Sequence, residues 1–136
     1  MAKKLMIVDD RAISRRLVRQ AAASPLDTVL ECASPEEALK ALSTFKPDCV
    51  MLGMSCPPPG ALHAIKIIRQ RHPEMRVLAI STFNEAETRE AARAAGASGY
   101  ATGENLSELF LLAAPERLVD RPVSYCLPRG HKRKNN

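Results

Sequence analysis

Pairs of polar side chains that could support chemistry directly follow short apolar runs of the sequence. Asp9 and Asp10 follow residues 5–8, and Ser81 and Thr82 follow residues 77–80. Carboxylates suit Mg²⁺, but this ion prefers octahedral oxygen coordination and keeps several waters, so two of them bind it weakly. We therefore expect no required cofactor and only weak Mg²⁺ binding at Asp9 and Asp10. The alternative role of this pair is structural, as a helix cap or an ion-pair partner.

The apolar runs alternate with helical patterns, which predicts βαβ units and a parallel sheet. Residues 5–8, 49–52 and 77–80 are continuously apolar, as expected of central strands covered on both faces. Residues 28–32 and 98–101 are more mixed and fit the sheet edges. The predicted fold class is α/β, a flavodoxin-like (βα)5 doubly wound parallel sheet with strand order 2-1-3-4-5.

Cap signals and periodicity predict the helices between these strands. Ser34, Pro35 and Glu37 form a capping box with proline at the first helical position, which predicts a helix over about 35–44. Cap-plus-acid spacing predicts two later helices, and periodicity predicts one over 11–23 and one over 61–71. The residues on which these predictions depend are Asn84 with Glu87, Asn105 with Glu108, an apolar face of Ile13, Leu17 and Ala21, and buried Leu62, Ile65 and Ile68.

The carboxyl ends of the strands in such a sheet are where ligands and chemistry collect. The sequence places Asp9 and Asp10 after the first strand, Gly53 after the third, Ser81 and Thr82 after the fourth, and Thr102 and Gly103 after the fifth. We therefore expect these side chains to share one edge of the sheet.

Three motifs together resemble the receiver domain of two-component response regulators. They are Val-Asp-Asp at 8–10, Gly53 followed four residues later by Pro57, and Ala-Gly-Ala-Ser-Gly-Tyr at 95–100. Residues 8–16 are most similar to chemotaxis-type receivers. The resemblance implies an acid pair that helps to hold Mg²⁺, an aspartate after the third strand that accepts a phosphoryl group, a Ser or Thr that contacts the phosphoryl oxygens, and a lysine after the fifth strand.

Two parts of that arrangement are replaced in this chain. Gly53 stands where the resemblance places the phosphoacceptor aspartate, and Gly103 stands where it places the lysine. Phosphoryl transfer to the protein needs a nucleophile and a cation that opposes developing negative charge. Asp48 is no substitute, because the strand puts it about 16 Å from position 53. We predict that the chain is not phosphorylated and is not an enzyme, with Ser81, Thr82 and Gly103 as remnants of a phosphate site.

Three functions follow from this resemblance. The first is a phosphorylation-independent signalling or interaction domain of the response regulator family. The second is an ordinary phosphorelay response regulator, or the receiver fragment of a transcription regulator, carrying an Asp-to-Gly change at position 53. The third is a small-molecule sensor that uses the space vacated above Gly53.

The expected partner surface lies around the fifth strand. In receivers the aromatic residue at the position of Tyr100 rotates inward on activation; the alternative is a half-buried aromatic residue at the sheet edge. The last predicted helix is apolar all round, which requires cover on both sides. We expect a homodimer through the face made by helix 4, strand 5 and helix 5, including Tyr100, Leu109 and Phe110. The chain's own C-terminal segment is the alternative cover.

Length and charge set the domain organisation. The 136 residues suffice for one domain, which we place at residues 1–114, the resemblance covering about 3–114. Residues 115–136 are predicted to be a C-terminal extension with a basic, disordered tail. Of the net charge of +5, four charges come from this tail. A short basic tail without aromatic residues is usually solvated, so nucleic-acid binding is not expected.

The remaining signals exclude several classes of protein. No apolar run is long enough to span a bilayer, and no secretory signal is expected, so we predict neither a membrane association nor export. The cysteines form no CxxC pair and are expected to be reduced core thiols in a cytoplasmic protein. We expect surface positions for His63 and His72.

Overall fold

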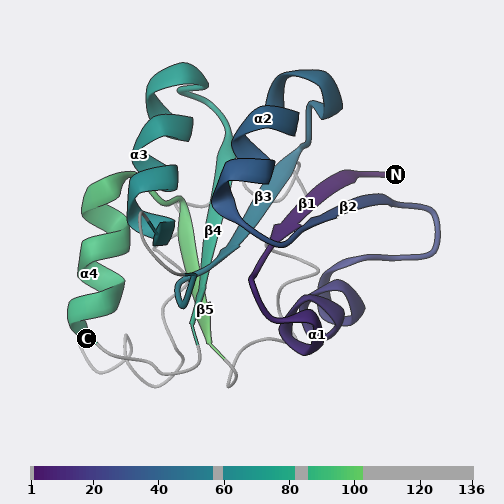
Figure 1. Cartoon of the computed structure of the whole chain (residues 1–136), viewed down its shortest axis with the longest axis horizontal. Helices are drawn as coiled ribbons and strands as arrows, with labels where there is room; N and C mark the ends of the chain where they lie inside the picture. Colours follow the sequence, from purple (N-terminus) through teal and green to yellow (C-terminus); the bar gives the residue numbers. More distant parts are fainter. Residues whose placement is uncertain (1, 57–59, 82–85, 103–136) are drawn as a thin grey trace, which may run out of the picture.

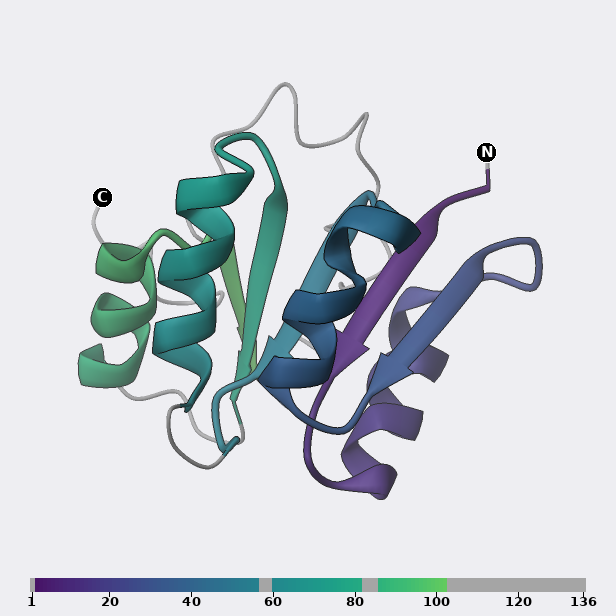
Figure 2. The ribbon, with the colours of Figure 1, turned by 45° about the horizontal axis from the view of Figure 1, so that its top comes forward.

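A five-stranded parallel sheet forms the centre of the molecule, as the computed structural model of residues 2–56, 60–81 and 86–102 shows. Its strand order is β2-β1-β3-β4-β5, which confirms the predicted fold class. Helices α2, α3 and α4 lie side by side on one face of the sheet, and α1 lies on the other (Figures 1 and 2). The elements are β1 Lys4–Val8, α1 Ala12–Ala22, β2 Thr28–Cys32, α2 Pro35–Phe45, β3 Cys49–Gly53, α3 Gly60–Arg71, β4 Arg76–Ser81, α4 Ala86–Ala95 and β5 Gly99–Thr102.

The central strands are buried as their apolar sequences predict. Every residue of β3 is buried, as are four of the five in β1. Alternate side chains enter two clusters, because successive residues of a strand point to opposite faces. One cluster lies under α2, α3 and α4, and the other meets Val18 and Ala22 of α1. The edge strand β2 is mostly half-buried or exposed, whereas all four residues of the other edge strand, β5, are buried.

The predicted capping box starts α2. Ser34 Oγ accepts a hydrogen bond of 3.2 Å from the backbone N–H of Glu37, and Pro35 is the first helical residue. Glu37 Oε1 accepts in return from the N–H of Ala33 at 3.0 Å, one residue before the cap. The helix ends at Lys46, whose left-handed φ of 53° closes the last turn with a bond of its N–H to Leu42 O.

The predicted apolar face of α1 is wrong at two of its three residues, whereas the third, Ala21, is half-buried and packs against the core. Ile13 and Leu17 are 75% and 49% exposed, and the helix instead buries Val18 and Ala22. On the same side of the helix as Val18 and Ala22, Arg15 and Arg19 both pair with Glu31 on β2.

Leu62 of α3 is a second correction, since it is exposed rather than buried. The buried positions are Ala61, Ala64, Ile65 and Ile68, which form one stripe at helical spacing. Small alanines bring α3 close to its neighbours, and Leu62 falls outside this stripe.

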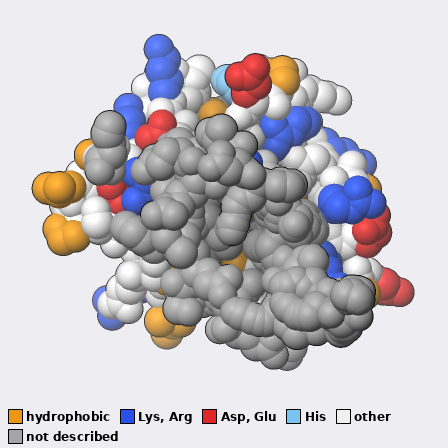
Figure 3. All heavy atoms as spheres, turned by 180° about the vertical axis from the view of Figure 1, so that it is seen from behind, with side chains coloured by type: hydrophobic (Ala, Val, Ile, Leu, Met, Phe, Trp, Pro, Cys, Tyr) orange, Lys and Arg blue, Asp and Glu red, His pale blue; other side chains and the backbone are white. Residues whose placement is uncertain are grey.

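Several predictions lie outside the described residues. These include the caps at Asn84 and Asn105, the last helix, the domain boundary at residue 114 and the extension over 115–136. Among the helices that the structure describes, none has the length and apolar character needed to cross a bilayer. Viewed from behind (Figure 3), a few hydrophobic side chains protrude at the rim, interspersed with Lys and Arg.

Candidate functional site

The carboxyl ends of three adjacent strands bring the main candidate residues together. Asp9 follows β1, Gly53 ends β3, and Ser81 ends β4. The register places Val8 beside Leu52, so that Asp9 follows at the level of Gly53. In Figure 2 the arrowheads of the strands point toward this same end of the sheet. The predicted gathering of these residues at one edge is therefore present in the fold.

Asp9 fills the space above Gly53. A β-carbon built on Gly53 would lie 2.9 Å from the carboxyl carbon of Asp9 and 3.3 Å from the carbonyl oxygen of Val8, and Asp9 Oδ2 is closer still. The backbone of Gly53 does not have the positive φ that favours glycine. Glycine is needed here for space, because any side chain would displace the carboxyl group of Asp9.

Local hydrogen bonds hold Asp9 in this position. Its side chain is only 4% exposed. Asp9 Oδ1 accepts a bond of 2.9 Å from the backbone N–H of Arg11 and lies 3.5 Å from Arg11 Nε. Arg15 donates from its guanidinium to the backbone carbonyl of Asp9 at 2.8 Å. The next residue, Asp10, is exposed.

The residues at this edge do not fit the magnesium site that the resemblance implies. Gly53 supplies no oxygen ligand, and Arg11 already engages one oxygen of Asp9. Within residues 2–56, 60–81 and 86–102, no group of three or more His, Cys, Asp or Glu side chains could hold a metal ion. Asp9 is hydrogen-bonded and ion-paired in this structure, as its structural alternative predicts, and weak Mg²⁺ binding at Asp9 and Asp10 stays a prediction.

Cys56 lies next to this site and is chemically quiet. Burial is the main cause that raises the pKa of its thiol to about 11; a backbone hydrogen bond at Asp10 opposes this shift, and the charges of Asp9 and Asp10 add to it. The group is therefore protonated at neutral pH and offers no thiolate nucleophile. The described cysteines Cys32, Cys49 and Cys56 are all buried and free, which agrees with their prediction as core thiols.

Tyr100 is buried, with 1% of its surface exposed. It is among the largest fully buried side chains and packs in the cluster under α2, α3 and α4. The alternative of a half-buried edge aromatic is therefore wrong. Ser81 is partly buried and pairs in register with Thr102 of β5. Four other candidates, Thr82, Gly103, Leu109 and Phe110, lie outside the described residues.

Arg11 is the site residue that sequence reasoning missed. An aspartate side chain often accepts from the backbone N–H two residues later, so the Asp9-x-Arg11 spacing was a usable signal. Nothing in the spacing of Arg15 showed its bonds to Asp9 and Glu31.

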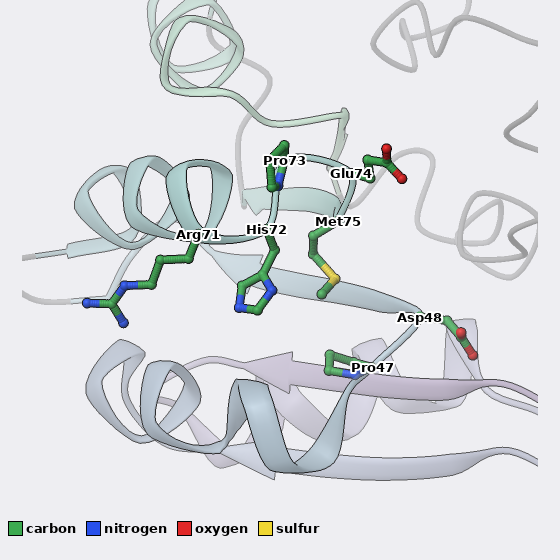
Figure 4. Close-up of a pocket in the computed structure, with 7 residues that line it drawn as sticks. All are labelled: Pro47, Asp48, Arg71, His72, Pro73, Glu74 and Met75. Carbon is green, nitrogen blue, oxygen red and sulfur yellow. The ribbon is translucent and has the colours of Figure 1, made fainter.

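Two of the pockets that the described residues form lie near the ends of the strands. One of about 420 Å³ lies next to Gly53, between the starts of α3 and α4, and its lining is Met54, Cys56, Gly60, Ala61, Leu62, Glu87, Thr88 and Ala91. The other, of about 510 Å³, lies at the opposite end of the strands, where His72 is half-buried. In Figure 4, His72 and Met75 point toward Pro47, whereas Arg71 and Glu74 point away, so the charged groups do not converge on a ligand.

Comparison with known proteins gives consistent matches. The family described as "Response regulator receiver domain" matches residues 5–109. Response regulator GacA of Pseudomonas syringae pv. syringae (strain B728a) is 32% identical over 128 residues, which cover 89% of this chain and 60% of GacA. The DNA-binding transcriptional activator DevR/DosR of Mycobacterium tuberculosis (strain ATCC 25618 / H37Rv) is 33% identical over 99 residues, covering 71% and 46%. The chain thus spans about 60% or less of these two curated relatives.

Solved structures show the same similarity. A LuxR-family two-component response regulator from Aurantimonas sp. SI85-9A1 is 30% identical, with a TM-score of 0.72 and 80% of each chain covered. The chemotaxis response regulator CheY4 of Vibrio cholerae is 21% identical, with a TM-score of 0.71, and 82% of this chain and 94% of CheY4 are covered. At that identity CheY4 supports the fold alone.

Proposed function

The chain belongs to the response regulator receiver domain family, and from this premise we propose that it is a phosphorylation-independent signalling or interaction domain. One observation carries the proposal. At Gly53, where the resemblance places the phosphoacceptor, the carboxyl group of Asp9 takes up the space that an acceptor side chain would need. A phosphoryl group therefore has no carboxylate on β3 to attack it, and a side chain at this position would first have to displace the carboxyl group of Asp9.

The neighbouring groups offer no replacement nucleophile. Asp48 stands before β3, at its far end, and its carboxylate accepts a bond of 2.9 Å from the backbone N–H of Lys4. The thiol of Cys56 is protonated at neutral pH because its pKa is raised to about 11. The sequence also has Gly103 in place of the expected lysine, which removes the cation that would oppose charge on a transferred phosphoryl group.

The buried position of Tyr100 supports a constitutive arrangement. In receivers the inward position of this ring accompanies activation, and here the ring is 1% exposed without an acceptor aspartate in the chain. We propose that partner binding by this chain does not wait for a phosphoryl signal. The free, buried thiols fit a cytoplasmic setting for this activity.

The proposed partners are proteins, including a second copy of the chain through the helix 4, strand 5 and helix 5 face. The described part of that face has small and charged side chains, since the large hydrophobic residues exposed in the described residues lie outside α4 and β5. Contact through this face therefore depends on Leu109 and Phe110. Light scattering of a Leu109→Ser/Phe110→Ser variant tests this, and a parent chain that is monomeric at all concentrations would refute the homodimer.

The decisive experiment is incubation with acetyl phosphate and Mg²⁺, followed by intact-mass measurement. A receiver that retains its aspartate serves as the positive control under identical conditions. We expect the control to gain the mass of one phosphoryl group and this chain to gain none. A phosphoryl adduct on this chain, released by hydroxylamine, would refute the proposed function.

A second candidate function follows from the names of the relatives. GacA is a response regulator, and DevR/DosR is a DNA-binding transcriptional activator. We propose as the alternative an ordinary phosphorelay response regulator, or the receiver fragment of a transcription regulator, with an Asp-to-Gly change. The Gly53→Asp/Gly103→Lys variant distinguishes the two: rapid phosphorylation of this variant favours the alternative, and failure despite correct folding favours the phosphorylation-independent domain.

A further inference from the structure

We infer that Arg11 replaces the divalent cation of the strand-end site, so that an internal Arg11–Asp9 ion pair closes the site and no Mg²⁺ binds there. The inference rests on the proposed function, because it takes the site to lack an acceptor carboxylate. It adds a specific role for Arg11 and a specific consequence, which is that the site does not respond to magnesium.

The first support is the environment of the Asp9 carboxylate. A buried carboxylate is costly unless it is hydrogen-bonded and paired with a cation. Asp9 Oδ1 receives both the backbone N–H of Arg11, at 2.9 Å, and its guanidinium, with Nε at 3.5 Å. Asp9 Oδ2 is turned toward Gly53. The carboxylate thus has a donor and a counter-charge from the same residue.

The second support is the position of Arg11 at the start of α1. Arg11 is the N-cap residue, and its side chain makes no capping hydrogen bond. The first turn of α1 contains no acidic residue that would favour a cation there. A positive charge at a helix N-terminus opposes the helix dipole, which costs about 0.3–1 kcal/mol. Arginine at this position is therefore unfavourable for the helix itself, and pairing with Asp9 accounts for it.

The third support is the charge that a metal ion would meet. Mg²⁺ approaching Asp9 would come next to the Arg11 guanidinium and near Arg15, which donates to the Asp9 carbonyl. Like charges at such distances repel, even where solvent screens them. Asp10 is exposed and offers one carboxylate, and Gly53 offers none. The guanidinium of Arg11, which belongs to the chain, therefore takes the place of a metal ion that would exchange with solvent.

The test is a titration of the full chain with Mg²⁺, and with Mn²⁺ as a paramagnetic probe, followed by ¹H–¹⁵N NMR. The variants are Arg11→Gln, which removes the charge, Arg11→Lys, which keeps it, and Arg16→Gln as the matched control on an exposed position of the same helix. We expect only weak shifts at residues 8–11 and 53–56, without saturation at millimolar Mg²⁺, in the parent, Arg11→Lys and Arg16→Gln. Arg11→Gln should reach the same shift at up to about fivefold lower Mg²⁺ concentration, for the loss of one partly exposed charge.

Two results overturn the inference. One is saturable, submillimolar Mg²⁺ binding by the parent chain. The other is an equal, weak Mg²⁺ affinity in Arg11→Gln and Arg16→Gln. The spectra themselves report whether each variant is folded. If Arg11→Gln is not folded, Arg11→Lys isolates the effect of the charge. Failure of the proposed function is separate, because it is read as a phosphoryl adduct. Magnesium binding without an adduct would refute the role of Arg11 and leave the proposed function standing.

Discussion

The carboxyl carbon of Asp9 lies 2.9 Å from the point where a β-carbon on Gly53 would stand. Real side chains do not tolerate so close a contact, so even Gly53→Ala must push Asp9 away from its bond with Arg11. Forcing extra atoms into a packed interior typically costs about 1–3 kcal/mol. We expect Gly53→Ala to lower the free energy of unfolding by that amount, measured by urea denaturation.

A double-mutant cycle identifies the cause. In an Asp9→Ala background the space above Gly53 is free, and Gly53→Ala should cost less than in the parent, with a coupling energy of about 0.5–3 kcal/mol. An equal cost in both backgrounds would mean that Asp9 is not what excludes a side chain. The same result would weaken the argument that an acceptor aspartate has no room here.

A buried ion pair joins the starts of the adjacent strands β1 and β2 and should make stability depend on pH. Lys3 Nζ lies 2.8 Å from Asp27 Oδ2, and the two side chains are 6% and 0% exposed. Burial alone would raise the pKa of Asp27, but hydrogen bonds from Lys3 and from the backbone of Ser24 outweigh it, and the pKa is lowered from its ordinary 3.8. The carboxylate is thus stabilised in the folded state.

The sign of the pH dependence follows from this lowered pKa. The stabilisation is complete above the unfolded pKa near 3.8 and is lost as the pH falls from there through the folded value. We expect Asp27→Asn to lose about 3–5 kcal/mol at neutral pH, because it removes the acidic partner of a buried ion pair. Its stability should then fall less steeply than that of the parent below about pH 4. The measurement is urea denaturation across this pH range, with Glu74→Gln at an exposed position as control. If the free energy of unfolding had the same slope against pH in the parent and in Asp27→Asn, the assignment would be refuted.

The strand order and the site edge were predictable from sequence, because continuous apolar runs mark central strands and a parallel sheet brings their carboxyl ends together. The orientation of α1 was not. Ile13 and Leu17 form an apolar stripe in the sequence, yet the helix buries Val18 and Ala22 and places Arg15 and Arg19 beside Glu31. Ion pairs between residues 12 to 16 positions apart leave no periodic signal.

The absence of a side chain at position 53 was predictable, but the position of the Asp9 carboxyl group above it was not. The sequence shows that Gly53 lacks a side chain, whereas the direction of the Asp9 carboxylate depends on packing between two strands and on the N–H of Arg11. The burial of Tyr100 is similar: its position on an edge strand suggested partial exposure, and only the neighbouring α4 and its alanines show how the ring is covered.

Arg69 joins the ends of α3 and α4, and its loss should be costly. Its guanidinium donates to the carbonyl of Gly96 from Nε at 3.0 Å and from a terminal nitrogen at 2.7 Å, and to the carbonyl of Pro73 at 2.6 Å. Arg69→Met keeps the aliphatic stem and removes these bonds, so we expect a loss of about 2–3 kcal/mol in the free energy of unfolding. Arg71→Met, on an exposed position of the same helix, should change stability by less than about 0.5 kcal/mol. Similar losses of stability in the two variants would contradict the role of Arg69 in joining the ends of α3 and α4.

The burial of Tyr100 can be tested by fluorescence, because the chain has two tyrosines and no tryptophan. Tyr125→Phe leaves Tyr100 as the single fluorophore. A ring that is 1% exposed should be shielded from iodide, so quenching should be several-fold weaker in the folded chain than in urea. The constitutive arrangement further requires that acetyl phosphate with Mg²⁺ leaves this quenching unchanged. A folded chain quenched as strongly as the unfolded one would contradict the buried position, and protection that changes with the phosphoryl donor would show that Tyr100 still responds to phosphorylation.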